Sequence, residues 1–247
     1  MAVIWQKQTS HKLYEVRTAG ASKRLYTNGV LHTQYNPKSL MTGSVWDLLT
    51  LGGFFVPEGR LRRILVLGVG GGAALHQLNQ LFSPDEIVGV ELNRIHLTIG
   101  RRFFGLNQAP YLLVQDDAQA WIENYKGQPF DLIIDDMFGE NYGEPFRVAK
   151  ADQRWFGILM DRLSPEGALV LNFAETEDFN SCVATQGRVP GLNSGFRLST
   201  GNCENIVGIY SRTSSSTSEL RKRLREFPML DTRRASCKLK YNIRTLY

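Results

Sequence analysis

The chain has 247 residues, 43% of them hydrophobic and 21% charged, and a formal net charge of +5. This is the composition of a globular protein, and it excludes disordered and fibrous classes. No apolar run approaches the roughly 20 residues that a membrane-spanning helix needs, and the N-terminus lacks the basic and apolar regions of a signal peptide. Three dispersed cysteines form no CxxC and no disulfide framework, so we expect a cytoplasmic protein with no membrane partner.

Residues 1–56 are expected to form a small β-hairpin region followed by a helix. Short strand-like runs occur at 13–17 and 23–26, and Asn28-Gly29 is a strong signal for a tight turn. The segment 37–56 predicts a helix, which Gly52 and Gly53 would close.

A regular alternation of strands and helices begins at Arg62. Strands are predicted at 64–67, 86–91, 111–114, 130–134 and 167–173, and helices at 73–82, 94–104, 118–125 and 152–163. This order predicts a parallel sheet with helices on both faces. Residues 57–211 are therefore expected to form a Rossmann-like nucleotide-binding transferase domain.

The end of that domain changes character. Two strand-like runs, 196–200 and 205–210, are separated by only four residues, too few for a parallel crossover. We expect them to pair as an antiparallel hairpin. The fold class that follows is α/β, with a seven-stranded sheet of the methyltransferase type rather than that of a dehydrogenase.

The last segment, 212–247, is basic. It contains ten basic and three acidic residues, a net +7, while the rest of the chain carries −2. The serine-rich run 214–218 predicts a linker and helix N-cap before a helix at 219–227. A basic segment can attract nucleic acid, but a solvated helix face followed by a tail is the favoured interpretation, because no aromatic stacking platform is interleaved with the ArgLysArg run of the short helix.

Four glycines follow the first strand of the main domain, at Gly68 and Gly70–Gly72. A chain without Cβ atoms can turn sharply and allow a ligand to approach, and the following helix would supply free N–H groups. Gly68, Gly70 and Gly72 are therefore candidate contacts for a nucleotide or an amino-acid carboxylate. The run also fits G-x-G-x-x-A, so a dinucleotide stays open.

Acidic residues end the next strands. Glu91 could accept hydrogen bonds from both ribose hydroxyls. The segment Asp116-Asp117-Ala118 follows the third strand, where an acid can accept a hydrogen bond from an adenine amino group or cap the next helix.

Asp135 and Asp136 end the fourth strand. Because neighbouring strand residues point to opposite faces, one of them should enter the ligand cleft, where a carboxylate could hold an amine or take its proton. The four histidines have no metal-binding spacing, and no metal is predicted.

With these motifs in place, residues 25–174 resemble the spermidine synthase family, aminopropyltransferases on the class I methyltransferase fold. The resemblance rests on LeuTyrThrAsnGlyValLeu, IleLeuValLeuGlyValGlyGlyGly, ValGluLeuAsn, AspAlaGlnAlaTrpIle and PheAspLeuIleIleAspAspMetPhe, in that order. It implies S-adenosylmethionine or its decarboxylated form as co-substrate and a small-molecule amine as acceptor. It also implies the glycines at the thioether, Glu91 at the ribose, Asp117 at the adenine and Asp136 as the catalytic Asp.

Departures from the family pattern imply an altered acceptor site. Gly71 stands where the family usually has Asp, and Thr27–His32 replaces its LeuAspGly-x-x-Gln. ValTrpAsp (45–47) stands near the place of its TyrHisGlu, and Gly139, with Glu140 beside it, replaces a second acid.

Two other functions remain open: a small-molecule methyltransferase, and a non-catalytic nucleotide- or nucleic-acid-binding protein. We also expect a homo-oligomer.

Overall fold

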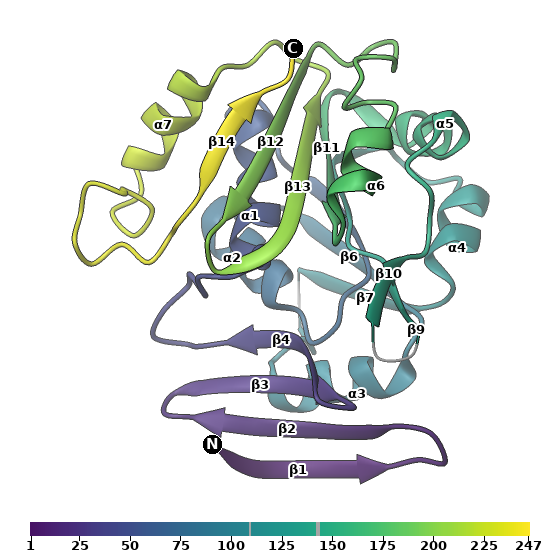
Figure 1. Ribbon diagram of the computed structural model, residues 1–247, viewed down its shortest axis with the longest axis vertical. Coiled ribbons are helices and arrows are strands. Elements are labelled where there is room, and N and C mark those ends of the chain that lie inside the picture. The colour runs from purple at the N-terminus through teal and green to yellow at the C-terminus, as the bar shows by residue number, and fades with distance from the viewer. Residues whose placement is uncertain (109, 142–143) are drawn as a thin grey trace.

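The structure, a computed structural model, describes residues 1–108, 110–141 and 144–247, without the side chains of residues 140, 141, 144 and 145. The side chain of Glu140 therefore lies outside the described residues. A four-stranded N-terminal sheet lies beside a larger α/β unit (Figure 1). None of the helices in the described ranges is long and apolar enough to span a membrane.

The N-terminal sheet is larger than the predicted hairpin. Its antiparallel strands follow the chain order: β1 (Ala2–Gln8), β2 (Leu13–Ala19), β3 (Ser22–Thr27) and β4 (Val30–Tyr35). The AsnGly turn joins β3 to β4, and both of its residues have positive φ, 50° at Asn28 and 84° at Gly29. Tyr14, Val16 and Leu25 pack this sheet against the end of α3.

The helix predicted at 37–56 is shorter than expected. It begins only at α1 (Val45–Thr50) and continues as the 3₁₀ helix η1 (Leu51–Phe55). The Asp47 carboxylate accepts from the backbone N–H groups of Thr42 and Gly43 and holds a turn before the helix. Gly52 does not close the segment but lies inside η1, where a Cβ would come within 2.2 Å of the Val170 side chain.

The main sheet has eight strands, so the predicted count of seven is wrong. Its order is β14-β12-β13-β11-β8-β5-β6-β7. The strands are β5 (Arg63–Leu67), β6 (Glu86–Glu91), β7 (Tyr111–Gln115), β8 (Phe130–Asp135), β11 (Leu163–Phe173), β12 (Ser194–Thr200), β13 (Cys203–Ser211) and β14 (Asn242–Thr245). The five from β7 to β11 are parallel, whereas β13 is antiparallel to β11 and to β12.

The sheet is buried on both faces. Along β5, Ile64 and Val66 belong to one hydrophobic cluster while Leu65 and Leu67 belong to the other. The helices are α2 (Ala73–Phe82), α3 (Arg94–Phe103), α4 (Ala118–Asn124), α5 (Gln153–Asp161), α6 (Thr176–Ser181) and α7 (Thr217–Arg225). Helices α1, α2 and α7 contribute to the first cluster, and α4, α5 and α6 to the second. The short hairpin β9 (Phe138–Asn141) and β10 (Glu144–Arg147) follows β8.

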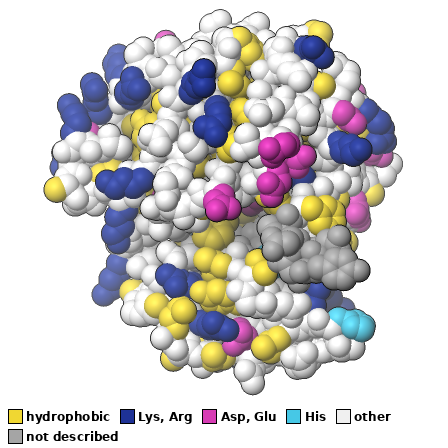
Figure 2. Space-filling view, in the orientation of Figure 1, with side chains coloured by type: hydrophobic (Ala, Val, Ile, Leu, Met, Phe, Trp, Pro, Cys, Tyr) yellow, Lys and Arg dark blue, Asp and Glu magenta, His cyan; other side chains and the backbone are white. Residues whose placement is uncertain are grey.

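The basic C-terminal segment is built into the main unit. Strand β14 pairs with β12, and Leu220, Leu224 and Leu239 are buried in the first hydrophobic cluster. Ser216 caps α7 in a capping box with Glu219, as the serine-rich run predicted. On the face of the molecule shown in Figure 2, Lys and Arg side chains gather around α7. The boundaries at 56/57 and 211/212 stay predictions.

Candidate functional site

A cavity of about 590 Å³ opens at the carboxyl ends of β5, β6 and β8 and is closed on one side by residues of the N-terminal sheet. This volume suits a small-molecule ligand. The cavity brings together six of the predicted site residues: Gly68, Gly70, Glu91, Asp117, Ala118 and Asp136. Two others, Gly72 and Asp116, are not among the residues that line it.

The backbone N–H groups of the glycine loop are all engaged by the protein. Those of Val69 and Gly70 donate to one oxygen of Glu91, at 3.1 and 2.8 Å. The Gly71 N–H donates to Thr33 Oγ1 at 2.6 Å, and those of Gly68 and Gly72 donate to backbone carbonyls at 2.9 Å. The N–H groups of the loop itself are therefore not free for a phosphate or carboxylate, because Glu91, Thr33 and two backbone carbonyls accept from them. The free N–H groups expected from the first turn of α2 stay a prediction.

The glycines are required by contacts within the protein. At Gly68, with φ 88°, a Cβ would lie 2.2 Å from the Asp136 carbonyl oxygen. At Gly70, with φ 55°, it would lie 2.7 Å from the His32 carbonyl oxygen on β4. A Cβ at Gly71 would meet the Thr33 side chain at 3.0 Å, which leaves little room for the Asp that the family has there. The loop thus joins the two sheets.

Glu91 is a largely buried carboxylate, with 11% of its side chain exposed, that holds this loop. Besides the two N–H groups on Oε2, its Oε1 accepts from the Asn93 N–H at 2.8 Å. Burial raises the pKa of Glu91, and the three backbone hydrogen bonds act in the opposite direction. A carboxylate has about four lone-pair positions, and these three backbone N–H groups use three of them.

Two histidines line the cavity, His32 from β4 of the N-terminal sheet and His96 from α3 of the main unit. His96 Nε2 lies 2.9 Å from the Thr27 hydroxyl, and its Nδ1 lies 3.9 Å from Glu91 Oε1. Its ring packs against that of His32, with 4.7 Å between centroids. Burial and the charge of Lys12 lower the pKa of His96 to about 4, so the imidazole is neutral at pH 7.

The contacts among Thr27, His32, Glu91 and His96 had no local signal in the sequence, because these four residues come from separate elements. Among the described residues, no three His, Cys, Asp or Glu side chains form a potential metal site.

Asp117 caps the following helix. Its Oδ1 accepts from the Ala120 N–H at 2.9 Å, so the capping alternative raised from the sequence holds for this residue. Asp116 accepts from the Asp117 N–H at 2.8 Å and stays outside the cavity lining. Asp117 also lines the cavity, so the helix cap does not exclude a contact between its carboxylate and an adenine. That contact stays a prediction.

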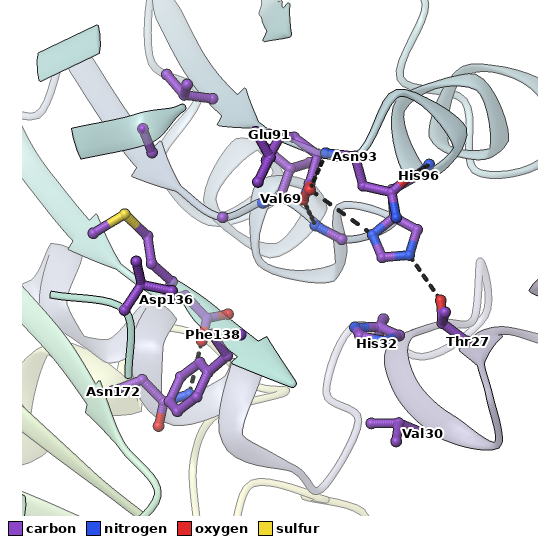
Figure 3. A pocket seen from close by; sticks show the side chains of 18 of the residues that line it. Thr27, Val30, His32, Val69, Glu91, Asn93, His96, Asp136, Phe138 and Asn172 are labelled. Carbon is purple, nitrogen blue, oxygen red and sulfur yellow. Dashed lines mark hydrogen bonds and ion pairs between the residues drawn. The ribbon is translucent and has the colours of Figure 1, made fainter. Parts of the chain in front are cut away.

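Asp135 and Asp136 point to opposite sides of the sheet, as the strand geometry predicted. Asp135 is fully buried, and its Oδ2 accepts from Arg147 at 2.6 Å and from the Trp155 indole at 2.8 Å. Asp136 faces the cavity, and its Oδ1 accepts from Asn172 Nδ2 at 2.7 Å (Figure 3).

The surroundings of Asp136 suit a proton acceptor near neutral pH. Burial raises the pKa of Asp136 to about 7; the hydrogen bond from Asn172 and the charge of Arg147 lower it, and the charges of Asp135 and Glu91 raise it. A carboxylate with a pKa near the working pH is an effective general base, and such perturbed groups in cavities are candidate catalytic residues.

The charge of the cavity favours a cationic ligand. Among the side chains that the structure describes, its lining contains three carboxylates, those of Glu91, Asp117 and Asp136, and one ammonium group, that of Lys12. A polyanionic dinucleotide would meet this excess of negative charge without free N–H donors in the glycine loop to offset it.

The positions that depart from the family pattern also reach the cavity. Its lining includes Thr27, Val30, Leu31, His32, Val45, Trp46 and Gly139. Asp47 does not belong to the lining, because its carboxylate accepts from Thr42, Gly43 and Gln77 instead.

No family model matches the chain. Over 106 residues it is 26% identical to Polyamine aminopropyltransferase 2 of Caldanaerobacter subterraneus subsp. tengcongensis, a match that covers 41% of this chain and 36% of that protein. The aligned part thus spans about a third of the length of this curated relative, which is by its name a transferase.

Solved structures match over far more of the chain. A probable spermidine synthase from Corynebacterium glutamicum has a TM-score of 0.75 and 17% identity, and the match covers 99% of this chain and 91% of that one. Spermidine synthase from Thermotoga maritima has a TM-score of 0.67 and 13% identity, with coverage of 92% and 78%. Human Methyltransferase-like protein 13, in complex with SAH, has a TM-score of 0.61 and 19% identity, with coverage of 72% and 88%.

The resemblance to the spermidine synthases is confirmed by sequence over part of the chain and by fold over nearly all of it. The α/β fold with a mixed central sheet is one that spermidine synthases and a methyltransferase-like protein share.

Proposed function

We propose that this chain is a transferase of the spermidine synthase type, which binds an S-adenosylmethionine-type nucleotide and transfers an aminopropyl group to an amine. The observation that carries this proposal is Asp136, a partly buried carboxylate with a pKa of about 7 that faces the cavity across from Glu91 (Figure 3). The aminopropyl chemistry is inferred from the similar proteins. The position of the proposed base is that of Asp136 in this structure.

The donor would occupy the nucleotide half of the cavity, by which we mean Gly68, Gly70, Glu91, Asp117 and Ala118. The remaining lone-pair position of Glu91 would accept from a ribose hydroxyl, and Asp117 would lie at the adenine. We assign no ligand contact to Gly72 or Asp116. Because the loop has no free N–H group and the lining is negative, the proposal favours a sulfonium nucleotide without a carboxylate, which is decarboxylated S-adenosylmethionine.

The acceptor would occupy the acceptor half, which comprises Trp46, Asp136, Phe138, Asn172 and Asn205. The amine nitrogen would attack the carbon next to the sulfonium. A C–N bond forms, the C–S bond breaks, and its electron pair remains on sulfur as a neutral thioether. The proton lost by the amine would pass to Asp136. Holding both reactants in one cavity would supply much of the acceleration.

An altered acceptor is part of this proposal. Where the family pattern has a TyrHisGlu and a second acid, the cavity has Val45, Trp46 and Gly139. Among the described side chains of the acceptor half, Asp136 supplies the carboxylate and the others are aromatic or amide groups. The true acceptor is thus expected to be an amine other than the usual polyamine precursor.

Calorimetric titration with decarboxylated S-adenosylmethionine, S-adenosylmethionine and NAD tests the donor. We expect the decarboxylated form to bind most tightly and NAD not to bind. Release of methylthioadenosine in the presence of a panel of primary amines then identifies the acceptor. Tighter binding of S-adenosylmethionine, with methyl transfer, would replace this proposal by the small-molecule methyltransferase.

Two neighbouring aspartates provide a matched control. Asp117→Asn removes the charge next to the bound nucleotide but keeps a good helix N-cap, so it should weaken nucleotide binding without unfolding α4. Asp116→Asn changes a carboxylate outside the lining and should leave the affinity unchanged. The homo-oligomer and the cytoplasmic location stay predictions, which sedimentation and cell fractionation would check.

A further inference from the structure

Asn172 is a polar residue in the buried, otherwise apolar second half of β11. It is 3% exposed and lies on β11 between Leu171 and Phe173, which are fully buried. Burial of an amide is unfavourable unless its hydrogen bonds are made. Its Nδ2 donates to Asp136 Oδ1 at 2.7 Å, between the carboxyl ends of two paired strands (Figure 3).

Asn205 determines which way the Asn172 amide faces. Asn205 Nδ2, on β13, donates to Asn172 Oδ1 at 3.1 Å. With its oxygen used in this way, the amide of Asn172 presents its NH₂ group to Asp136. A second carboxylate or a flipped amide at this place would repel an ionised Asp136.

Arg147 holds the backbone at the same point. One of its terminal nitrogens donates to the Asn172 carbonyl at 2.6 Å and the other to Asp135 Oδ2 at 2.6 Å. The guanidinium thereby ties the end of β8 to the end of β11. Both the main chain and the side chain of Asn172 are held in position.

We propose that Asn172, oriented by Asn205, is the positioning residue for Asp136: it occupies one carboxylate oxygen, leaves the other to take the proton of the acceptor amine, and stabilises the ionised form of the base. This inference rests on the proposed function. The pair acts through Asp136, and neither amide takes part in proton transfer.

The hydrogen bond from Asn172 affects the protonation of Asp136, because the groups around this carboxyl act on it in opposite directions. Burial and the carboxylates of Asp135 and Glu91 favour the protonated acid, whereas Asn172 and the Arg147 guanidinium favour the ionised base. Without the amide, Arg147 alone would oppose burial and two negative charges. The fraction of Asp136 that can accept a proton at pH 7 would then fall.

The test compares Asn172→Leu, which has a similar size but no amide, with Asn205→Leu and the wild type. We expect the pH midpoint of kcat/KM to rise by about one unit in Asn172→Leu, since a hydrogen bond to a charged group has that strength. At pH values below the midpoint, kcat/KM of Asn172→Leu should be about tenfold lower than that of the wild type, and it should recover at high pH. Asn205→Leu should shift the midpoint in the same direction by less.

Asn79→Leu is the matched control. Asn79 also makes a side-chain hydrogen bond, to Tyr111 at 3.2 Å, but it is not among the cavity residues. Its pH profile should match that of the wild type. An unchanged midpoint in Asn172→Leu, or an equal loss of rate at every pH, would overturn the inference.

A second measurement does not need activity. The ¹³Cγ signal of Asp136, assigned by its loss in Asp136→Asn, reports protonation directly. Its midpoint should rise in Asn172→Leu even if no aminopropyl transfer is found, so failure of the proposed function and failure of this inference are separate results. An unmoved signal in a variant that still unfolds cooperatively would refute the positioning role.

Discussion

The nucleotide half and the acceptor half of the cavity are held together by different kinds of hydrogen bond. In the nucleotide half, the Glu91 carboxylate accepts from three backbone N–H groups, those of Val69, Gly70 and Asn93. In the acceptor half, Asp136 accepts from the side chain of Asn172, which in turn accepts from that of Asn205.

This difference determines how far side chains can be substituted in each half. Backbone donors are independent of the side chains, so a glycine loop with one carboxylate suits many nucleotide-binding proteins. The acceptor half depends on side chains from β8, β11 and β13, and substitution there changes the chemistry without disturbing the loop. Of the departures from the family pattern, Trp46 belongs to the acceptor half, whereas Gly71 lies in the glycine loop.

The largest effect should come from Asp136→Asn, which removes the base of the acceptor half but keeps its size. We expect turnover to fall by about 10²–10⁴-fold, the usual range for a positioned acid–base group. Nucleotide affinity should change little, because the donor contacts lie in the other half. Steady-state kinetics with calorimetry as control would measure both. Full activity would remove Asp136 from the mechanism.

The same substitution should change how stability depends on pH. The pKa of Asp136 is about 7 in the folded protein, against an ordinary value of 3.8. Between these values the folded state keeps a proton that the unfolded state has lost, so this group's contribution to stability falls as pH rises, by about 1.4 kcal/mol per unit.

Asp136→Asn should therefore gain stability relative to the wild type from pH 4 to pH 7. Urea unfolding at several pH values measures the difference. A difference that stays constant over this range would show that the carboxyl group titrates normally.

Asp135→Asn separates structure from chemistry within one pair of neighbours. Its carboxylate is buried against Arg147 and Trp155, and removing one partner of a buried ion pair costs about 3 kcal/mol. We expect a lower unfolding free energy and a much smaller change in kcat than in Asp136→Asn. Equal kinetic losses in the two variants would mean that both act through disturbed local structure.

Glu91→Gln tests whether the nucleotide half depends on its carboxylate. The amide can accept through one oxygen only, and its NH₂ group would face backbone N–H donors. Nucleotide affinity should fall by about ten- to a hundredfold, since a hydrogen bond to a charged group has about this worth. Calorimetry gives the affinity. Unchanged binding would show that the loop holds its shape without Glu91.

The smallest effect is expected from the basic surface on α7, which belongs to neither half. Lys222 and Arg225 are exposed, and replacing both by Gln should leave nucleotide affinity and stability unchanged. Deleting 212–247 is a poorer test, because it would remove β14 and uncover buried leucines. Steeply salt-dependent RNA binding that this double variant loses would favour the nucleic-acid-binding alternative.

Local patterns were sufficient to predict the parallel strands and the meeting of Gly68, Gly70, Glu91 and Asp117 at one cavity. A buried strand, a glycine loop and an acid at the end of the next strand are close in sequence, and parallel strands place their carboxyl ends at one edge. The opposite directions of Asp135 and Asp136 followed from the two-residue period of a strand. The eighth strand was missed because Asn242–Thr245 is short and pairs with β12, more than 40 residues earlier.

The tertiary structure alone decided what surrounds these residues. No sequence pattern indicated that Thr33 would take the Gly71 N–H, that His96 would meet Thr27, or that Asn172 would reach Asp136. Each of these contacts joins residues at least 36 positions apart, and its formation depends on how the two sheets and the strand ends pack. The sequence by itself thus determined the fold class and the candidate base, while packing determined the protonation of that base and the hydrogen bonds still open to a ligand.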